Sequence, residues 1–149
     1  MFISLLATAA AVACPAPHAF ANTAPDELKG YRIVVAADGN SAVEAATLPA
    51  KHYPFPGSDK VMSVIDLAPS PAKAAKLVIG AADLVIPAKA SPSKEMILVI
   101  EGSSRIETPH GTADLSPGMF VIFEDIGAKI GHGGRIGPCG YVGLAMSPP

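Results

Sequence analysis

The sequence predicts an all-β fold in a single domain, and three observations support this class. The chain has 149 residues, a length that suits one domain. It contains 14 glycines and 15 prolines, which favour short strands and tight turns over long helices. Short apolar runs recur at nearly regular spacing between these turn residues, a pattern typical of a β-sandwich or β-barrel.

The first 21 residues have the features of a signal peptide. Residues 1–21 carry no charged side chain, and an apolar run over 2–13 is followed by the small-x-small pattern that ends at Ala21. This run is too short to cross a bilayer, which needs about 20 residues. We expect cleavage after Ala21, a periplasmic or secreted protein, and no transmembrane segment in the mature chain. A lipoprotein acylated at Cys14, a buried N-terminal helix and an upstream start stay open.

The first half of the mature chain predicts a lead followed by strands and turns. Residues 22–30 are expected to form a flexible lead, and 31–149 the folded domain. The sequence YRIVVA over 31–36 is β-type, and a turn cluster follows at 37–40. The stretch 70–77 is the one candidate for a helix, but it is short and uncapped, so we expect a turn at most. The strands expected in this half lie at 61–67, 76–79 and 83–86.

The second half predicts a strand, a hairpin and two further strands. EMILVIE over 95–101 has the strongest β pattern and ends at Gly102. Turn residues separate the elements after it, including a glycine-rich connection over 131–137. The strands expected after 101 lie at 105–108, 112–115, 119–124 and 141–146.

The charge of the chain gives no support for nucleic-acid binding. Lysine and arginine together number 11 against 13 acidic residues, which leaves a net charge of −2. No run of basic residues is present, and such runs neutralise phosphates in nucleic-acid-binding proteins. We therefore expect no nucleic-acid partner.

Two spacings resemble the motifs of cupins. Glu95 followed by six residues and Gly102 is similar to the second half of the first cupin motif, and Gly111 followed by five residues and Pro117-Gly118 is similar to the opening of the second. EDIGAKIGHGGR over 124–135 resembles a segment of small single-domain cupins, as does ADGNSAVEAATLP over 37–49. The likeness covers about residues 31–146. It implies a cupin-type jelly-roll β-barrel, or double-stranded β-helix, with a pocket between its sheets.

The resemblance also implies a metal site, from which this sequence departs. Cupin enzymes usually hold a divalent metal with an HxH pair, the glutamate and a later histidine, and the HxH position here is Lys89-Ala90-Ser91. A protonated lysine cannot ligate a metal. Glu95 and His132 remain as weak candidates, fewer than the three ligands that such sites generally need. We expect no tightly bound metal and no other cofactor.

Glu95 and His132 are the candidate acid and base. Glu95 alternates with Ile97 and Val99, so on a pocket face it would be an acid among apolar walls, suited to general acid or base catalysis. His132 lies among glycines that allow close approach to a ligand, and could shuttle a proton or orient a ligand. An ion-paired glutamate and a surface histidine are the alternatives. The candidate ligand-binding residues are Glu95, Glu124, His132 and Arg135.

Three functions follow as hypotheses, because fold alone does not choose among them. The first is an exported cupin-fold protein that binds a small organic molecule in its barrel pocket, without a tightly bound metal. The alternative is an isomerase, lyase or hydrolase-like enzyme that uses Glu95 and His132 as acid and base or as weak metal ligands. The third is a homodimerisation unit. Whether the protein is an enzyme, and which ligand it takes, stay open at this stage.

Overall fold

The computed structural model describes residues 25–54, 61–67 and 74–147, and within these ranges it contains nine strands and no helix. The all-β prediction is therefore confirmed. No helix in the described ranges has the length and hydropathy to span a membrane. The predicted signal peptide lies outside the described residues. The strands are β1 (Glu27–Val35), β2 (Ser41–Pro54), β3 (Val61–Ile65), β4 (Ala74–Gly80), β5 (Val85–Lys89), β6 (Glu95–Thr108), β7 (Gly111–Leu115), β8 (Phe120–Phe123) and β9 (His132–Ser147).

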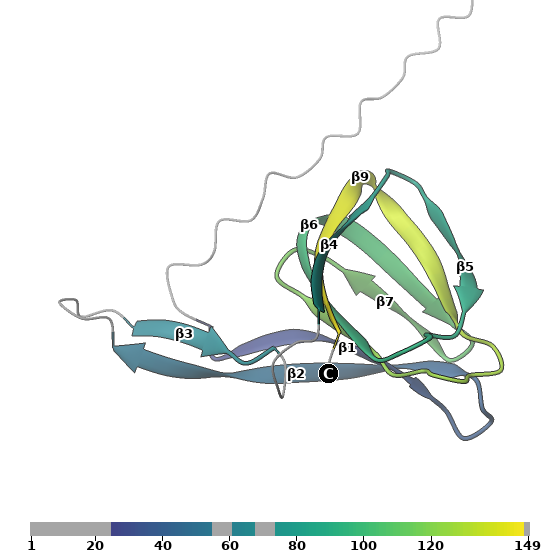
Figure 1. Cartoon of the computed structure of the whole chain (residues 1–149), viewed down its shortest axis with the longest axis horizontal. Coiled ribbons are helices and arrows are strands. Elements are labelled where there is room, and N and C mark those ends of the chain that lie inside the picture. The colour runs from purple at the N-terminus through teal and green to yellow at the C-terminus, as the bar shows by residue number, and fades with distance from the viewer. Residues whose placement is uncertain (1–24, 55–60, 68–73, 148–149) are drawn as a thin grey trace, which may run out of the picture.

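All nine strands belong to one mixed sheet that curls into a barrel (Figure 1). The main path runs β3-β2-β1-β8-β6-β9-β4, while β5 pairs with β9 and β7 pairs with β6. Strands β1 and β8 are parallel, and the other pairs are antiparallel. Figure 1 shows β4, β5, β6, β7 and β9 around the barrel, with β3 and the end of β2 extending beyond it as a ribbon.

Strands β6 and β9 pair with each other along most of their length. The first half of β6 pairs with the second half of β9, and the second half of β6 pairs with the first half of β9. The register shifts near Gly102, where the two strands bend together. Gly102 has φ +77°, and a Cβ there would lie 2.0 Å from the carbonyl oxygen of Gly140. Only glycine fits this corner without moving the backbone.

The core lies inside the barrel and is apolar. Alternation along the strands turns every second side chain inward, so that in β1 Ile33 is fully buried while Arg32 is exposed. The buried cluster that fills the interior consists of Ile33, Val99, Ile106, Ala113, Leu115, Val121, Ile136 and Tyr141.

The structure extends several expected strands. The flexible lead predicted for 22–30 is wrong for residues 27–30, which form the start of β1 because β2 is long enough to pair with them, Glu27 opposite Pro49. The strands expected at 95–101 and 105–108 are one 14-residue strand. The predicted glycine-rich connection is the start of β9, where a Cβ at Gly134 would lie 2.1 Å from the carbonyl oxygen of Arg105. Glycine here permits close strand packing and does not mark a loop.

The turn between β1 and β2 is tied to two other loops through Asp38. The backbone nitrogen of Asn40 donates to the Asp38 carboxylate over 3.0 Å, and His110 Nε2 lies 2.7 Å from the same carboxylate. Lys129 Nζ donates to the Asp38 carbonyl oxygen over 2.8 Å. The hydrogen bonds from Asn40 and His110 lower the pKa of Asp38 from 3.8 to about 2.

The Asp38 carboxylate is expected to stabilise the fold in a pH-dependent way. Because its pKa is lower in the folded chain, the ionised form stabilises the fold above about pH 4, and this contribution is lost as the pH falls to about 2. Urea denaturation of wild type and Asp38→Asn should therefore give a difference in unfolding free energy that shrinks across this window. A difference in unfolding free energy that stays constant from pH 6 to pH 2 would contradict the stabilising role of the ionised Asp38 carboxylate.

Candidate functional site

Four positions singled out by the cupin resemblance meet in one cleft, where β5 ends and β6 and β9 begin. Lys89, Ser91, Glu95 and His132 all line this space of about 360 Å³, which we call the mouth cleft. Its other polar side chains include Lys76 and Ser93. Residues far apart in the sequence are thus brought to one surface, although two positions that are histidines in metal-binding cupins are lysine and serine here.

An apolar cavity inside the barrel adjoins the mouth cleft. This interior cavity measures about 180 Å³. Ile86, Ile97, Phe123 and His132 line both spaces, so the two are neighbours with a shared wall. Together they form a site with a polar entrance and an apolar interior, the common composition of small-molecule pockets. The interior lining also includes Val78, Leu84, Ile106, Leu115, Val121 and Ile136.

His132 is held in place by a fully buried carboxylate. Its Nδ1 lies 2.8 Å from Oδ2 of Asp125, whose exposed fraction is 0%. The ring also stacks on Phe123, with centroids 4.5 Å apart and an interplanar angle of 29°. A carboxylate only accepts hydrogen bonds, so Nδ1 carries the hydrogen in this contact and Nε2 is the nitrogen left for a bound molecule.

Asp125 accepts hydrogen bonds from three groups in distant parts of the chain. Besides His132, the Ser41 hydroxyl donates to it over 2.6 Å and the Ser91 backbone nitrogen over 3.3 Å. Burial acts to raise the pKa of Asp125, but the bonds from Ser41, His132 and Ser91 together hold it below its usual value. Asp125 is therefore ionised at neutral pH and fixes the orientation of the imidazole.

Glu95 lines the mouth cleft as one half of an ion pair. Its Oε1 lies 2.8 Å from Lys76 Nζ, and the side chain is 25% exposed. The sequence raised an ion pair with Lys94, Lys89 or Arg105 as the alternative to a pocket acid; the structure combines the two, because Glu95 both lines the cleft and pairs with a lysine of β4. This carboxylate can accept a hydrogen bond from a ligand, and its charge is balanced.

Glu124 and Arg135, the other two candidate ligand-binding residues, are not brought together with Glu95 and His132 in these spaces. Neither lines the mouth cleft or the interior cavity. Arg32 Nε donates to Glu124 Oε2 over 2.7 Å, and Lys94 also contacts this carboxylate. Burial acts to raise the pKa of Glu124, but the bonds from Lys94 and Arg32 hold it below its usual value. Glu124 comes directly after the end of β8, and its ion pairs with Arg32 and Lys94 hold its side chain outside both spaces.

The residues at the implied metal position do not fit a divalent ion. No group of three or more histidine, cysteine, aspartate and glutamate side chains is arranged to hold one within the described ranges. Lys89 brings an ammonium to the place of a ligand, and Nδ1 of His132 is engaged by Asp125. Transition-metal sites generally need three or more neutral or anionic donors.

The sequence candidates did not include Asp125, which organises the site. Its neighbour Glu124 was taken instead, because adjacency along the chain cannot tell an outward carboxylate from an inward one. One signal was present: the segment 124–135, which resembles small cupins, contains both Asp125 and His132. Its partners Ser41 and Ser91 lie 84 and 34 residues away, so only the folded chain brings them together.

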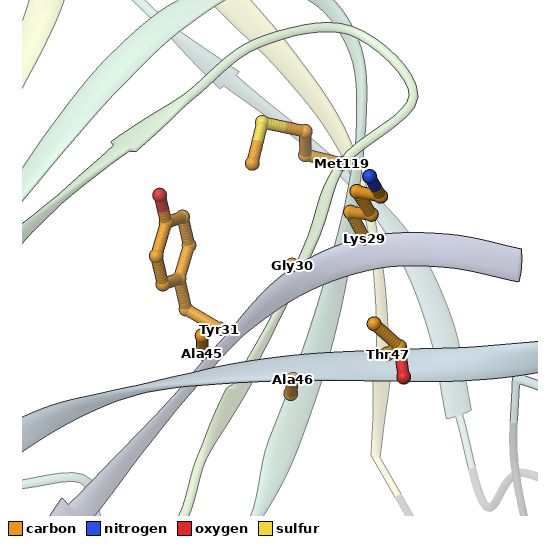
Figure 2. A pocket seen from close by; sticks show the side chains of 7 residues that line it. All are labelled: Lys29, Gly30, Tyr31, Ala45, Ala46, Thr47 and Met119. Carbon is orange, nitrogen blue, oxygen red and sulfur yellow. The ribbon is translucent and has the colours of Figure 1, made fainter.

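A third hollow lies on β1 and β2 and carries none of these groups. It measures about 340 Å³, and Figure 2 shows Tyr31, Met119 and Lys29 around it, above the backbone of Gly30. Its lining has no carboxylate and no imidazole. It therefore lacks the acid and base expected of a catalytic pocket, and the mouth cleft with the interior cavity is the candidate site.

Comparison with known proteins adds a likeness in fold. No protein family profile and no curated protein matches the chain. Among solved structures, it is similar to the cupin domain of Cnp3 from Schizosaccharomyces pombe, with 14% identity over 83% of this chain and 84% of that one and a TM-score of 0.42. At this identity the likeness concerns the fold alone. The described strands form a β-barrel, the architecture that the motif resemblance predicts.

Proposed function

We propose that this protein binds a small organic molecule, with a polar group in the mouth cleft and an apolar part in the interior cavity. The observation that carries the proposal is the pair of adjoining spaces, one polar and one apolar, that share His132, Phe123 and two isoleucines. Natural small-molecule sites combine apolar walls with a few placed polar groups in the same way. The uncharged apolar start of the chain supports a role after export, in the periplasm or outside the cell.

A screen of sugars, organic acids and amino acids by thermal shift tests the proposal. A ligand present at 100 times its dissociation constant adds about 2.7 kcal/mol to the stability of the folded protein, which raises the melting temperature by a measurable amount. We expect at least one chemical class to give this shift, with a dissociation constant confirmed by calorimetry. If every class fails to shift the melting temperature, the binding function is wrong.

A matched pair of variants then tests the location of the site. Glu95 and Glu124 are both partly buried glutamates paired with lysines, but only Glu95 lines the mouth cleft. Glu95→Gln should change the ligand affinity by about tenfold, because the loss of its charge leaves Lys76 unpaired in the mouth cleft. Glu124→Gln should leave the affinity unchanged. Equal changes in the two variants would place the ligand elsewhere.

Acid–base catalysis is the second candidate function, and the contact between Asp125 and His132 favours it. A buried carboxylate that orients one ring nitrogen leaves the other suited to accept or give a proton, as in the histidines of many hydrolases. Following the ligand by NMR in the presence of protein separates the two functions. An unchanged ligand after hours at neutral pH indicates binding alone, and conversion that is lost in His132→Gln indicates catalysis.

A further inference from the structure

One positive charge in the mouth cleft has no opposite charge beside it. The charged side chains that line the cleft, apart from His132, are Lys76, Lys89 and Glu95. Lys76 and Glu95 pair over 2.8 Å and balance each other. Lys89 forms no ion pair with any residue in the described part of the chain. Asp125, the carboxylate that contacts His132, is fully buried and accepts hydrogen bonds from three donors. The cleft thus presents a single uncompensated cation.

The backbone holds Lys89 beside His132. The two residues are direct partners in the antiparallel pairing of β5 and β9, so their side chains leave the same face with Cβ atoms about 5 Å apart. At Gly131 an added Cβ would lie 2.0 Å from the Lys89 carbonyl carbon, so the two strand ends are in close contact. The ammonium and the imidazole are therefore presented together to whatever occupies the cleft.

Apolar side chains with large exposed fractions line the interior cavity that adjoins the mouth cleft. Ile79, Leu84 and Ile86 line the interior cavity, yet they are 76%, 50% and 44% exposed. Exposed apolar groups gathered at the edge of a cavity are typical of a binding surface, since an apolar ligand gains free energy by covering them. Ile86 lines the mouth cleft as well, so the apolar surface reaches the polar entrance.

We infer that the ligand is an amphipathic monocarboxylate: its carboxylate binds Lys89 in the mouth cleft, and its short apolar chain enters the interior cavity. This inference rests on the small-molecule-binding function proposed above and names the chemical class. One uncompensated cation matches a monoanionic head group, whereas a dianionic phosphate generally recruits several cationic donors. The ion pair of Glu95 with Lys76 keeps that carboxylate from repelling the ligand.

Calorimetric titration of the full chain with three matched compounds tests the inference. Hexanoate has both the head group and the chain, hexanamide has the chain with a neutral head, and acetate has the head alone. We expect hexanoate to bind about tenfold or more tightly than either of the other two, because only it meets both halves of the site. Equal affinities for hexanoate and hexanamide would overturn the inference.

Lysine variants test whether Lys89 is the residue that binds the ligand carboxylate. Lys89→Met should remove the preference for hexanoate over hexanamide, and Lys89→Arg should retain it. Lys29→Met is the control, because Lys29 is an exposed lysine that lines the separate hollow of Figure 2. A preference that survives in Lys89→Met, or disappears in Lys29→Met, would refute the assigned position.

The outcomes separate this inference from the function on which it rests. Binding of neutral compounds without any preference for carboxylates refutes the inference and leaves small-molecule binding in place. Failure of every class in the thermal-shift screen refutes the binding function itself, and the inference with it.

Discussion

Replacing Asp125 with alanine is expected to lower the free energy of unfolding by about 3–5 kcal/mol, because three donors lose their shared acceptor and each buried unpaired donor costs about 1–3 kcal/mol. The Asp125 carboxylate is fully buried and accepts hydrogen bonds from Ser41, Ser91 and His132. Its removal leaves all three donors without an acceptor in the interior. Buried donors left unpaired cost far more than a paired hydrogen bond contributes. Urea denaturation followed by far-ultraviolet circular dichroism measures the change, since the chain contains no tryptophan.

Asp114→Ala is the matched control for this experiment. Asp114 accepts hydrogen bonds from Arg105 at 2.7 and 3.0 Å, but both side chains are more than half exposed. Water screens such surface pairs, so a small change is expected. Similar losses of stability in the two aspartate variants would contradict the role of Asp125 as a buried acceptor of three hydrogen bonds.

The same carboxylate joins stability to function at this site. Asp125 links the start of β2, through Ser41, to the segment before β6, through Ser91, and to the first residue of β9, His132. Three donors fix the position of the Asp125 carboxylate. The fixed carboxylate in turn holds the His132 ring in one orientation, whereas a histidine on an isolated loop could rotate. In Asp125→Asn, we expect the fold to survive better than in the alanine variant, while His132 loses its preferred tautomer.

Local pattern was enough to predict the all-β class and many of the strands. The runs at 95–101 and 119–124 are rich in β-branched and large apolar residues; the first lies within β6, and the middle four residues of the second form β8. The sequence did not predict β2 as a strand, or that His132 would begin β9. Glycine and proline act locally as turn residues, and only the neighbouring strands decide whether they lie in a ladder.

The part of the candidate site that could be predicted is the part that motif spacings along the chain identify. Glu95 and His132 were singled out from the motif resemblance, and both line the mouth cleft. The sequence raised Lys89 as the residue in place of a metal ligand and as an ion-pair partner of Glu95, because a sequence does not show which charge stays unbalanced in the folded chain. The ion pair of Lys76 with Glu95 joins β4 to β6, a contact that no short-range pattern contains.

The corner of the barrel at Gly102 gives the second large expected effect. Gly102→Ala should lower the free energy of unfolding by about 3 kcal/mol or more, because two costs add. A non-glycine residue at φ +77° is strained by about 1–3 kcal/mol. In addition, the new Cβ would lie 2.0 Å from the Gly140 carbonyl oxygen, a backbone atom in the paired strand that cannot rotate away.

Gly118→Ala separates these two costs, because Gly118 has almost the same backbone conformation in open surroundings. Its φ is +83°, and an added Cβ would meet no atom within 4 Å. We expect this variant to lose only the strain, about 1 kcal/mol. Both glycines belong to the spacings that resemble cupin motifs, yet Gly102 is needed for close packing and Gly118 for a turn. Equal losses would mean that β6 and β9 can move apart at their bend, and that the corner does not require glycine for packing.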